Sequence, residues 1–153
     1  MIEVYTVSLF GHRLIENMIE VEKAIERIVE KITLSHDFTV FLVGCEGDFD
    51  RIATSVIHRA KKLRDNISLI LVLPYPKSEY IRNCESYNKF YDDVEIYSSL
   101  EKVHPKAAYQ IRNRYMVDRS DEVIFYVKDK IGGAAKTLRY AENKGKKIIN
   151  VGQ

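Results

Sequence analysis

A pair of glycines, Gly132-Gly133, lies where an apolar, strand-like run gives way to a helical pattern. A turn at that point leaves the free N–H groups of a helix N-terminus open to an anion. Lys136 and Thr137 follow within one helical turn and would add a cation and a hydroxyl donor. Phosphate binding is one interpretation of this turn, and a tight corner with a surface lysine is the other. The segment is not a Walker P-loop, because Ala135 stands where that motif needs a glycine before the lysine.

A second candidate is the turn Gly11-His12-Arg13, which follows the first apolar run. It places a flexible backbone, an imidazole and a guanidinium side by side. Glycine permits close approach of a ligand, and the planar fork of arginine matches phosphate or carboxylate. Taken alone, the triplet is more simply explained as a strand-to-helix turn with an exposed arginine.

The loop GCEGDFD at 44–50 is rich in glycine and acidic residues. Its candidate ligand-binding residues are Gly44, Cys45, Glu46, Gly47, Asp48 and Asp50. Carboxylates do not bind phosphate, but they suit ribose hydroxyls, a metal ion or the N-terminus of a helix. Asp48 or Asp50 is placed to cap the helix that follows. The spacing matches no known ion-binding loop, so we expect no metal.

These residues must be positioned by alternating apolar runs and amphipathic segments. Apolar, β-branched runs predict strands at 4–10, 38–43, 67–73, 94–97, 123–127 and 148–151. Apolar residues at helical spacing predict helices over 15–32, 52–63 and 134–143, a short helix within 77–100, and one that begins at His104-Pro105. The alternation implies an α/β fold with a doubly wound, mostly parallel sheet and helices on both faces. We expect one domain over residues 1–153.

Such a sheet also indicates where a ligand would bind. Open parallel sheets hold ligands beyond the carboxyl ends of their strands, near the point where the strand order reverses. This rule selects the turns at 11–13, 44–50, 74–77 and 128–133. The three candidate stretches therefore fall at one edge of the predicted sheet.

The composition excludes some classes of protein. A net charge of +2, from 24 basic and 22 acidic residues, argues against nucleic acid as an obligatory partner, although it allows a local basic patch. No apolar run reaches the roughly 18 residues of a membrane-spanning helix. Cys45 and Cys84 belong to no metal-binding motif. We expect a reduced, cytoplasmic protein without a membrane partner.

From residue 112 to residue 145 the chain carries an ordered set of motifs. An Arg-Asn-x-x-Met-Val-Asp segment at 112–118 leads into a strand near Asp121, and the Gly-Gly turn with Thr137 opens the next helix. This block resembles the YpsA-like branch of the SLOG superfamily, which comprises Rossmann-like domains related to the LOG phosphoribohydrolases and to the DNA-processing protein DprA. The first half is similar too, at Gly11-His12-Arg13, Gly44, Gly47, Asp50 and Ala53.

The resemblance implies a Rossmann-like fold, a nucleotide-like ligand and a homo-oligomer. LOG enzymes cleave the N-glycosidic bond of a nucleoside monophosphate with an arginine and a glutamate. Arg112 matches the arginine and is the candidate catalytic residue. The glutamate has no counterpart, because none follows Gly132-Gly133 before Glu142. A carboxylate is what would stabilise positive charge on the ribose, so the resemblance favours binding over turnover.

We therefore expect a domain that binds or senses a nucleotide or an ADP-ribose-like derivative, without a cofactor. A nucleotide N-glycosidase is the first alternative, and a single-stranded-DNA-binding protein is the second. In the expected site Gly132-Gly133 holds a phosphate, which Arg112 and Arg13 neutralise. Asp48 or Asp50 meets a ribose hydroxyl, and Asn113 fixes a loop or a polar edge of the ligand.

Overall fold

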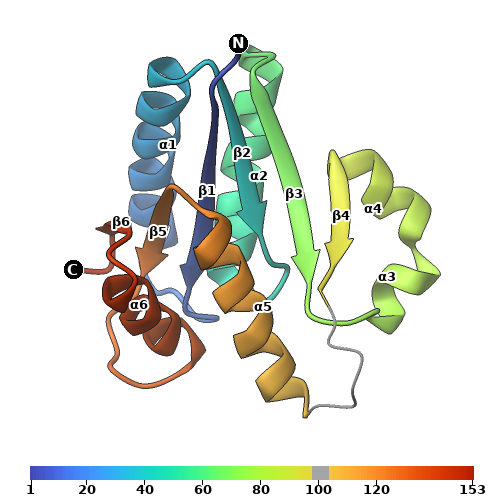
Figure 1. The fold of residues 1–153 in the computed structure, drawn as a ribbon, viewed down its shortest axis with the longest axis vertical. Coiled ribbons are helices and arrows are strands. Elements are labelled where there is room, and N and C mark those ends of the chain that lie inside the picture. The colour runs from blue at the N-terminus through green and yellow to red at the C-terminus, as the bar shows by residue number, and fades with distance from the viewer. Residues whose placement is uncertain (98–103) are drawn as a thin grey trace.

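The computed structural model of the chain describes residues 1–97 and 104–153, and its centre is a β-sheet (Figure 1). The six strands stand in the order β4-β3-β2-β1-β5-β6, and every neighbouring pair is parallel. They are β1 (Val4–Gly11), β2 (Phe38–Val43), β3 (Ile67–Leu73), β4 (Asp93–Ile96), β5 (Glu122–Tyr126) and β6 (Lys147–Asn150). The order reverses between β1 and β5, as in doubly wound folds. The predicted fold class is confirmed.

Helices cover both faces of this sheet. Helices α1 (Met18–Ser35) and α2 (Gly47–Leu63) pack on one face, and α5 (Pro105–Arg119) and α6 (Gly133–Asn143) pack on the other (Figure 1). Two short helices, α3 (Ser78–Arg82) and α4 (Cys84–Phe90), lie beside the edge strand β4. Within the described ranges, no helix has the length and apolar character needed to cross a membrane.

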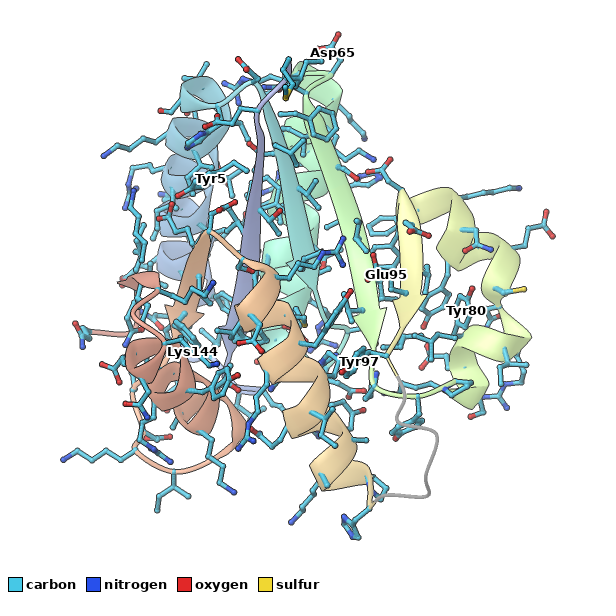
Figure 2. The ribbon with its side chains drawn as sticks, viewed as in Figure 1. Tyr5, Asp65, Tyr80, Glu95, Tyr97 and Lys144 are labelled. Carbon is cyan, nitrogen blue, oxygen red and sulfur yellow. The ribbon has the colours of Figure 1, made fainter. Side chains whose placement is uncertain are left out.

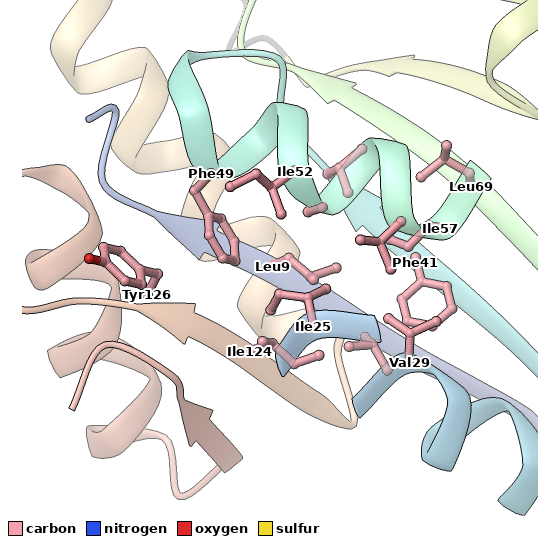
Figure 3. Close-up of a cluster of buried hydrophobic side chains, with 14 of the residues drawn as sticks. Leu9, Ile25, Val29, Phe41, Phe49, Ile52, Ile57, Leu69, Ile124 and Tyr126 are labelled. Carbon is pink, nitrogen blue, oxygen red and sulfur yellow. The ribbon is translucent and has the colours of Figure 1, made fainter. Parts of the chain in front are cut away.

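Alternate residues of each central strand face opposite cores. Leu9, Phe41 and Ile124 pack with α1 and α2, whereas Phe10 and Phe125 pack with α5 and α6. Figure 3 shows the first of these cores, which α1 and α2 close against the sheet. Strands that are buried on both faces read as continuous apolar runs. For this reason the sequence predicts the bounds of β2 and β3 correctly.

The segment before α1 differs from the prediction. The expected helix includes Ile15, but α1 begins at Met18, with Asn17 at its N-cap. Ile15 is buried in the preceding loop, where its N–H donates a hydrogen bond to Asp48 Oδ2 over 3.0 Å. The apolar side chain of Ile15 therefore packs into the core from a loop and not from a helix. The single short helix expected within 77–100 is two helices, α3 and α4, and residues 98–100 of that stretch lie outside the described ranges.

Edge strand β4 anchors α5 from the side. Glu95 Oε1 lies 2.7 Å from Arg119 Nη1, and the Tyr97 ring stacks on Tyr115 with centroids 4.3 Å apart. Figure 2 shows Glu95 on β4 and Tyr97 directly after this strand. With its C-terminal half fixed in this way, α5 extends its N-terminal half beyond the carboxyl ends of the strands (Figure 1). That half of α5 supplies side chains to the candidate site.

Candidate functional site

The candidate site lies at the carboxyl ends of β1 and β5. Strand β1 pairs with β2 on one side and β5 on the other, and the helices that follow β1 and β5 lie on opposite faces of the sheet. Connections that diverge in this way leave a crevice, which is where open parallel sheets bind ligands. Here the crevice is a cavity of about 700 Å³, within the range of small-molecule sites. We call it the switch-point cavity.

Most of the predicted site residues line the switch-point cavity. The end of β1 and the turn after it contribute Gly11, His12 and Arg13, the loop after β2 contributes Glu46, and the first turn of α2 contributes Asp50. Helix α5 contributes Arg112 and Asn113, and the start of α6 contributes Gly132, Gly133 and Lys136. The fold thus brings together the turns that the sequence singles out separately.

The N-terminus of α6 opens into the cavity without a side-chain cap. Gly132 takes the N-cap position with a φ of +108°, which glycine adopts without the strain that a side chain would cause. The N–H groups of the first turn have no partner inside the helix. Lys136 lies one turn further on and is exposed. Backbone donors, the positive end of the helix and a lysine make this part of the cavity suited to an anion.

Arg112 is the buried cation of the cavity, with 5% of its surface exposed. Its Nε donates to Asn113 Oδ1 over 2.8 Å, and its Nη1 donates to the Val72 carbonyl over 2.7 Å. The remaining nitrogen, Nη2, forms no hydrogen bond with any residue that the structure describes. Burial lowers the pKa of Arg112, and the Asp50 carboxyl acts to raise it. Because arginine stays charged at neutral pH, the cavity holds a positive charge with a donor to spare.

Asp50 shares this part of the cavity. Its Oδ2 accepts a hydrogen bond from the backbone N–H of Glu46 over 2.8 Å. Burial raises the pKa of Asp50 to about 7, against the opposing influence of the Arg112 and Arg13 guanidinium groups. A Cβ at Gly44 would lie 2.8 Å from Asp50 Oδ2 and 3.2 Å from Arg112 Nη1. Gly44 itself does not line the cavity. Because it has no side chain, it leaves room for the carboxyl of Asp50 and the guanidinium of Arg112.

Glu46 is held by residues from two other elements. Its Oε1 accepts a hydrogen bond from the Tyr109 hydroxyl over 2.7 Å and forms an ion pair with Lys77 Nζ. Lys77 Nζ also donates to the Tyr109 hydroxyl over 2.9 Å. The Arg112 guanidinium lies 5.2 Å from the centroid of the Tyr109 ring, one turn further along α5. These contacts fix a carboxylate in the wall of the cavity.

Neither Asp48 nor Asp50 takes the N-cap position of α2, contrary to the sequence prediction. The N-cap residue is Glu46, whose own side chain makes no capping hydrogen bond, although Asp50 Oδ2 accepts from the Glu46 backbone N–H at this end of the helix. Asp48 Oδ2 accepts from the Ile15 N–H over 3.0 Å, and its Oδ1 lies 2.6 Å from Arg51 Nη2. The hydrogen bond from Ile15 and then Arg51 lower the pKa of Asp48. Asp48 therefore organises the loop before α1 and does not line the cavity.

Other predicted residues hold the walls in place. His12, itself in the wall, accepts at Nε2 from the N–H groups of Lys128 and Asp129 over 2.9 and 3.1 Å. This joins the turn after β1 to the loop after β5. Gly47 has a φ of +86°, and a Cβ there would lie 2.5 Å from Arg13 Cα, so glycine lets the two loops cross closely.

Thr137 and Cys45 lie behind the walls. Thr137 is buried, accepts from Asn113 Nδ2 over 3.0 Å and donates to the Gly133 carbonyl over 2.9 Å. Cys45 lines a second cavity of about 530 Å³ beside α2 and the end of α4, and both Cys45 and Cys84 are free thiols.

Sequence reasoning missed the residues of α5 that precede Arg112. Lys106, Tyr109 and Gln110 line the cavity, and Lys77 reaches its wall through Glu46. Helical spacing is the signal that was available. Tyr109 lies three residues before Arg112 and Lys106 three before that, and such spacing places side chains on one face of a helix.

Comparison with protein-family models finds no match, and comparison with curated proteins finds none either. Comparison with solved structures finds DNA processing protein A, DprA, from two bacteria. The Streptococcus pneumoniae protein superimposes with a TM-score of 0.65 and 17% sequence identity, over 95% of this chain and 50% of that chain. The Helicobacter pylori protein, whose structure describes a single-stranded DNA binding mode, superimposes with a TM-score of 0.64 and 20% identity, over 95% of this chain and 64% of that chain.

The fold is similar to that of DprA. This likeness confirms the Rossmann-like fold that the sequence motifs imply, whereas membership of the SLOG superfamily stays a prediction. The chain spans half of the Streptococcus protein and less than two thirds of the Helicobacter protein. The finer assignment to the YpsA-like branch stays a prediction.

Proposed function

We propose that the chain binds a nucleotide or a nucleotide derivative, such as an ADP-ribose-like molecule, in the switch-point cavity. The observation that carries this proposal is the uncapped N-terminus of α6, which opens into the same cavity as Arg13, Arg112 and Lys136. Free backbone N–H groups and guanidinium donors match the oxygen atoms of a phosphate. Among the residues that the structure describes, Arg13 and Lys136 form no salt bridge, so both are available to an anion.

The state of Arg112 supports the same ligand. Asp50 is the carboxyl that influences this guanidinium most, and its pKa of about 7 leaves it partly protonated at neutral pH. The buried positive charge is therefore incompletely balanced, and Nη2 of Arg112 has a donor to offer. An anionic group in the cavity would supply both the missing charge and the missing acceptor.

The resemblance to the YpsA-like branch points to the same cavity. Arg112, Asn113 and Gly132-Gly133 carry the most specific part of that resemblance, and they lie in its wall although they come from different helices. Nucleotide-derived ligands are what the resemblance implies for this arrangement.

Isothermal titration calorimetry tests the proposal. The panel contains nucleoside mono-, di- and triphosphates, cyclic nucleotides and ADP-ribose, and at least one should bind with a one-to-one stoichiometry. No binding across the panel would remove the proposal. Chromatography of the same samples tests the N-glycosidase alternative, because release of a free base that is lost in Arg112→Ala would make the chain an enzyme.

Single-stranded DNA is the second candidate ligand. The exposed Lys106 and Lys136 line the cavity, and Lys128 and Lys130 are exposed on the loop after β5. The Helicobacter DprA structure describes a single-stranded DNA binding mode. Fluorescence anisotropy with a labelled oligonucleotide tests this candidate. Affinity should fall steeply with salt if phosphate contacts carry binding. A strand that a mononucleotide displaces would occupy the same cavity, and the absence of any shift would remove the candidate.

A further inference from the structure

Glu46 presents one oxygen that its neighbours leave unused. Both the Tyr109 hydroxyl and Lys77 Nζ engage Oε1. Oε2 forms no hydrogen bond within the part of the chain that the structure describes. A carboxylate oxygen only accepts hydrogen bonds. The part of a ligand that meets Glu46 must therefore be an O–H or N–H donor, and it cannot be a phosphate.

Two further acidic residues, in the first turn of α2, are less suited to this task. Asp48 is occupied by the Ile15 N–H and by Arg51, and it does not line the cavity. Asp50 directs Oδ2 to the backbone N–H of Glu46. Asp50 also lines the cavity, but its carboxyl faces the charges of Arg112 and Arg13 and burial raises its pKa, so Glu46 is the better candidate for an uncharged donor.

The position of Glu46 indicates which part of a nucleotide it meets. Its backbone N–H binds Asp50, and Arg112 and Arg13 are the cations whose charges act on Asp50. Glu46 therefore lies next to the cations that would neutralise the phosphate. The sugar is the part of a nucleotide directly bonded to the phosphate, and the hydroxyls of ribose are adjacent O–H donors. A carboxylate on sugar hydroxyls is a pairing that parallel α/β sheets also use elsewhere.

We propose that Glu46 binds the sugar hydroxyls, so that the switch-point cavity selects ribonucleotides over 2′-deoxyribonucleotides. Tyr109 and Lys77 act as positioning residues, because they hold the carboxylate by its other oxygen. This inference rests on the proposed nucleotide function. A 2′-deoxyribonucleotide removes one donor and leaves a charged acceptor in the wall without a partner, which sites built on hydrogen bonds reject strongly.

Calorimetry with matched nucleotides tests the inference. AMP and GMP should each bind about tenfold or more tightly than 2′-deoxy-AMP and 2′-deoxy-GMP, as expected for a hydrogen bond to a charged group. In Glu46→Gln the amide oxygen would remain with Lys77 and Tyr109, which turns the amide N–H donors toward the ligand. The ratio of ribo to deoxy affinity should then fall, because a neutral N–H donor replaces the charged acceptor and the ribonucleotide binds more weakly.

Two further variants separate selection from folding. Asp48→Asn removes a carboxylate in the first turn of α2 that lies outside the cavity, and it should keep the full ratio. Tyr109→Phe keeps the ring and removes one of the two donors to Glu46, so the ratio should fall by part of the effect seen in Glu46→Gln. A loss of structure alone would weaken both nucleotides equally, and thermal unfolding of each variant reveals such a loss.

Three outcomes would overturn the inference. Equal affinity for the ribo and deoxy forms would refute it and leave the proposed function standing. Selection that follows the base, seen as a difference between AMP and IMP that Glu46→Gln abolishes, would assign Glu46 to the base. Failure of every nucleotide to bind would remove the proposed function, and the inference with it.

Discussion

Asn113 Nδ2 donates a hydrogen bond to Thr137 Oγ1 over 3.0 Å and so joins α5 to α6 behind the switch-point cavity. Both residues are buried. The Asn113 Oδ1 atom accepts from Arg112 Nε over 2.8 Å, so the same amide holds the buried guanidinium. The helix that supplies the buried cation and the helix whose N-terminus is the proposed phosphate site are therefore linked through one side chain.

Thr137→Val tests this link with little change of shape. The variant removes the hydroxyl and leaves a buried Asn113 donor without its partner. We expect the free energy of unfolding to fall by about 1–3 kcal/mol. Urea unfolding at neutral pH measures it, and Thr137→Ser, which keeps the hydroxyl, should lose much less. A larger loss in Thr137→Ser than in Thr137→Val would show that the methyl group, not the hydrogen bond, matters.

Gly44→Ala should damage the site from outside the cavity. The added Cβ would lie 2.8 Å from Asp50 Oδ2 and 3.2 Å from Arg112 Nη1, so one of the two buried groups must move. Overpacking of this kind costs about 1–3 kcal/mol of stability. Gly133→Ala is the matched control, because its Cβ meets the flexible end of Gln110 at 3.3 Å. Urea unfolding should show a clear loss for Gly44→Ala and little or none for Gly133→Ala, and the reverse order would contradict the packing argument.

The sequence predicts the frame of the site because the frame depends on short-range patterns. Burial on both faces makes β2 and β3 continuous apolar runs, and a parallel sheet necessarily gathers the turns after β1, β2 and β5 at one edge. The turns at 11–13 and 132–133 could be selected on that basis, and both line the cavity.

The roles of the loop carboxylates could not be predicted in the same way. Asp48, Asp50 and Glu46 lie within five residues, and no local pattern distinguishes them. Their roles depend on partners distant in the chain: Ile15 for Asp48, and Lys77 with Tyr109 for Glu46. The crossing of Gly47 over Arg13 brings the first of these contacts about. Such contacts between loops leave no periodic signal in the sequence.

Lys136→Met should weaken phosphate binding without destabilising the fold. The side chain is exposed and lies one turn into α6, on the wall of the cavity. Loss of a charge-assisted contact should reduce the affinity for ADP-ribose about tenfold. Lys144→Met is the control for net charge. Lys144 is the C-cap residue of α6, and its Nζ lies 3.9 Å from Asp118 Oδ1. Calorimetry measures the affinity of both variants for ADP-ribose. Equal losses of affinity would indicate a general effect of charge, and no loss in Lys136→Met would place the phosphate elsewhere.

Asp50 makes the stability of the fold depend on pH in an unusual direction. Burial raises its pKa from 3.8 to about 7, so the folded state binds this proton more tightly than the unfolded chain does. Between about pH 4 and about pH 7 the folded protein therefore binds more protons than the unfolded chain. The stabilisation is therefore complete below about pH 4 and is lost as the pH rises toward about 7.

Asp50→Asn and Asp48→Asn should consequently show opposite trends. The wild type should lose on the order of a few kcal/mol relative to Asp50→Asn between about pH 4 and about pH 7, and little more above that. The pKa of Asp48 is lowered in the fold, so the wild type should instead gain stability relative to Asp48→Asn as the pH rises through the acid range. Urea unfolding across this range measures both differences. Parallel trends in the two variants would refute the assignment of the raised pKa to Asp50, because both carboxyls lie in the first turn of α2 and differ only in their surroundings.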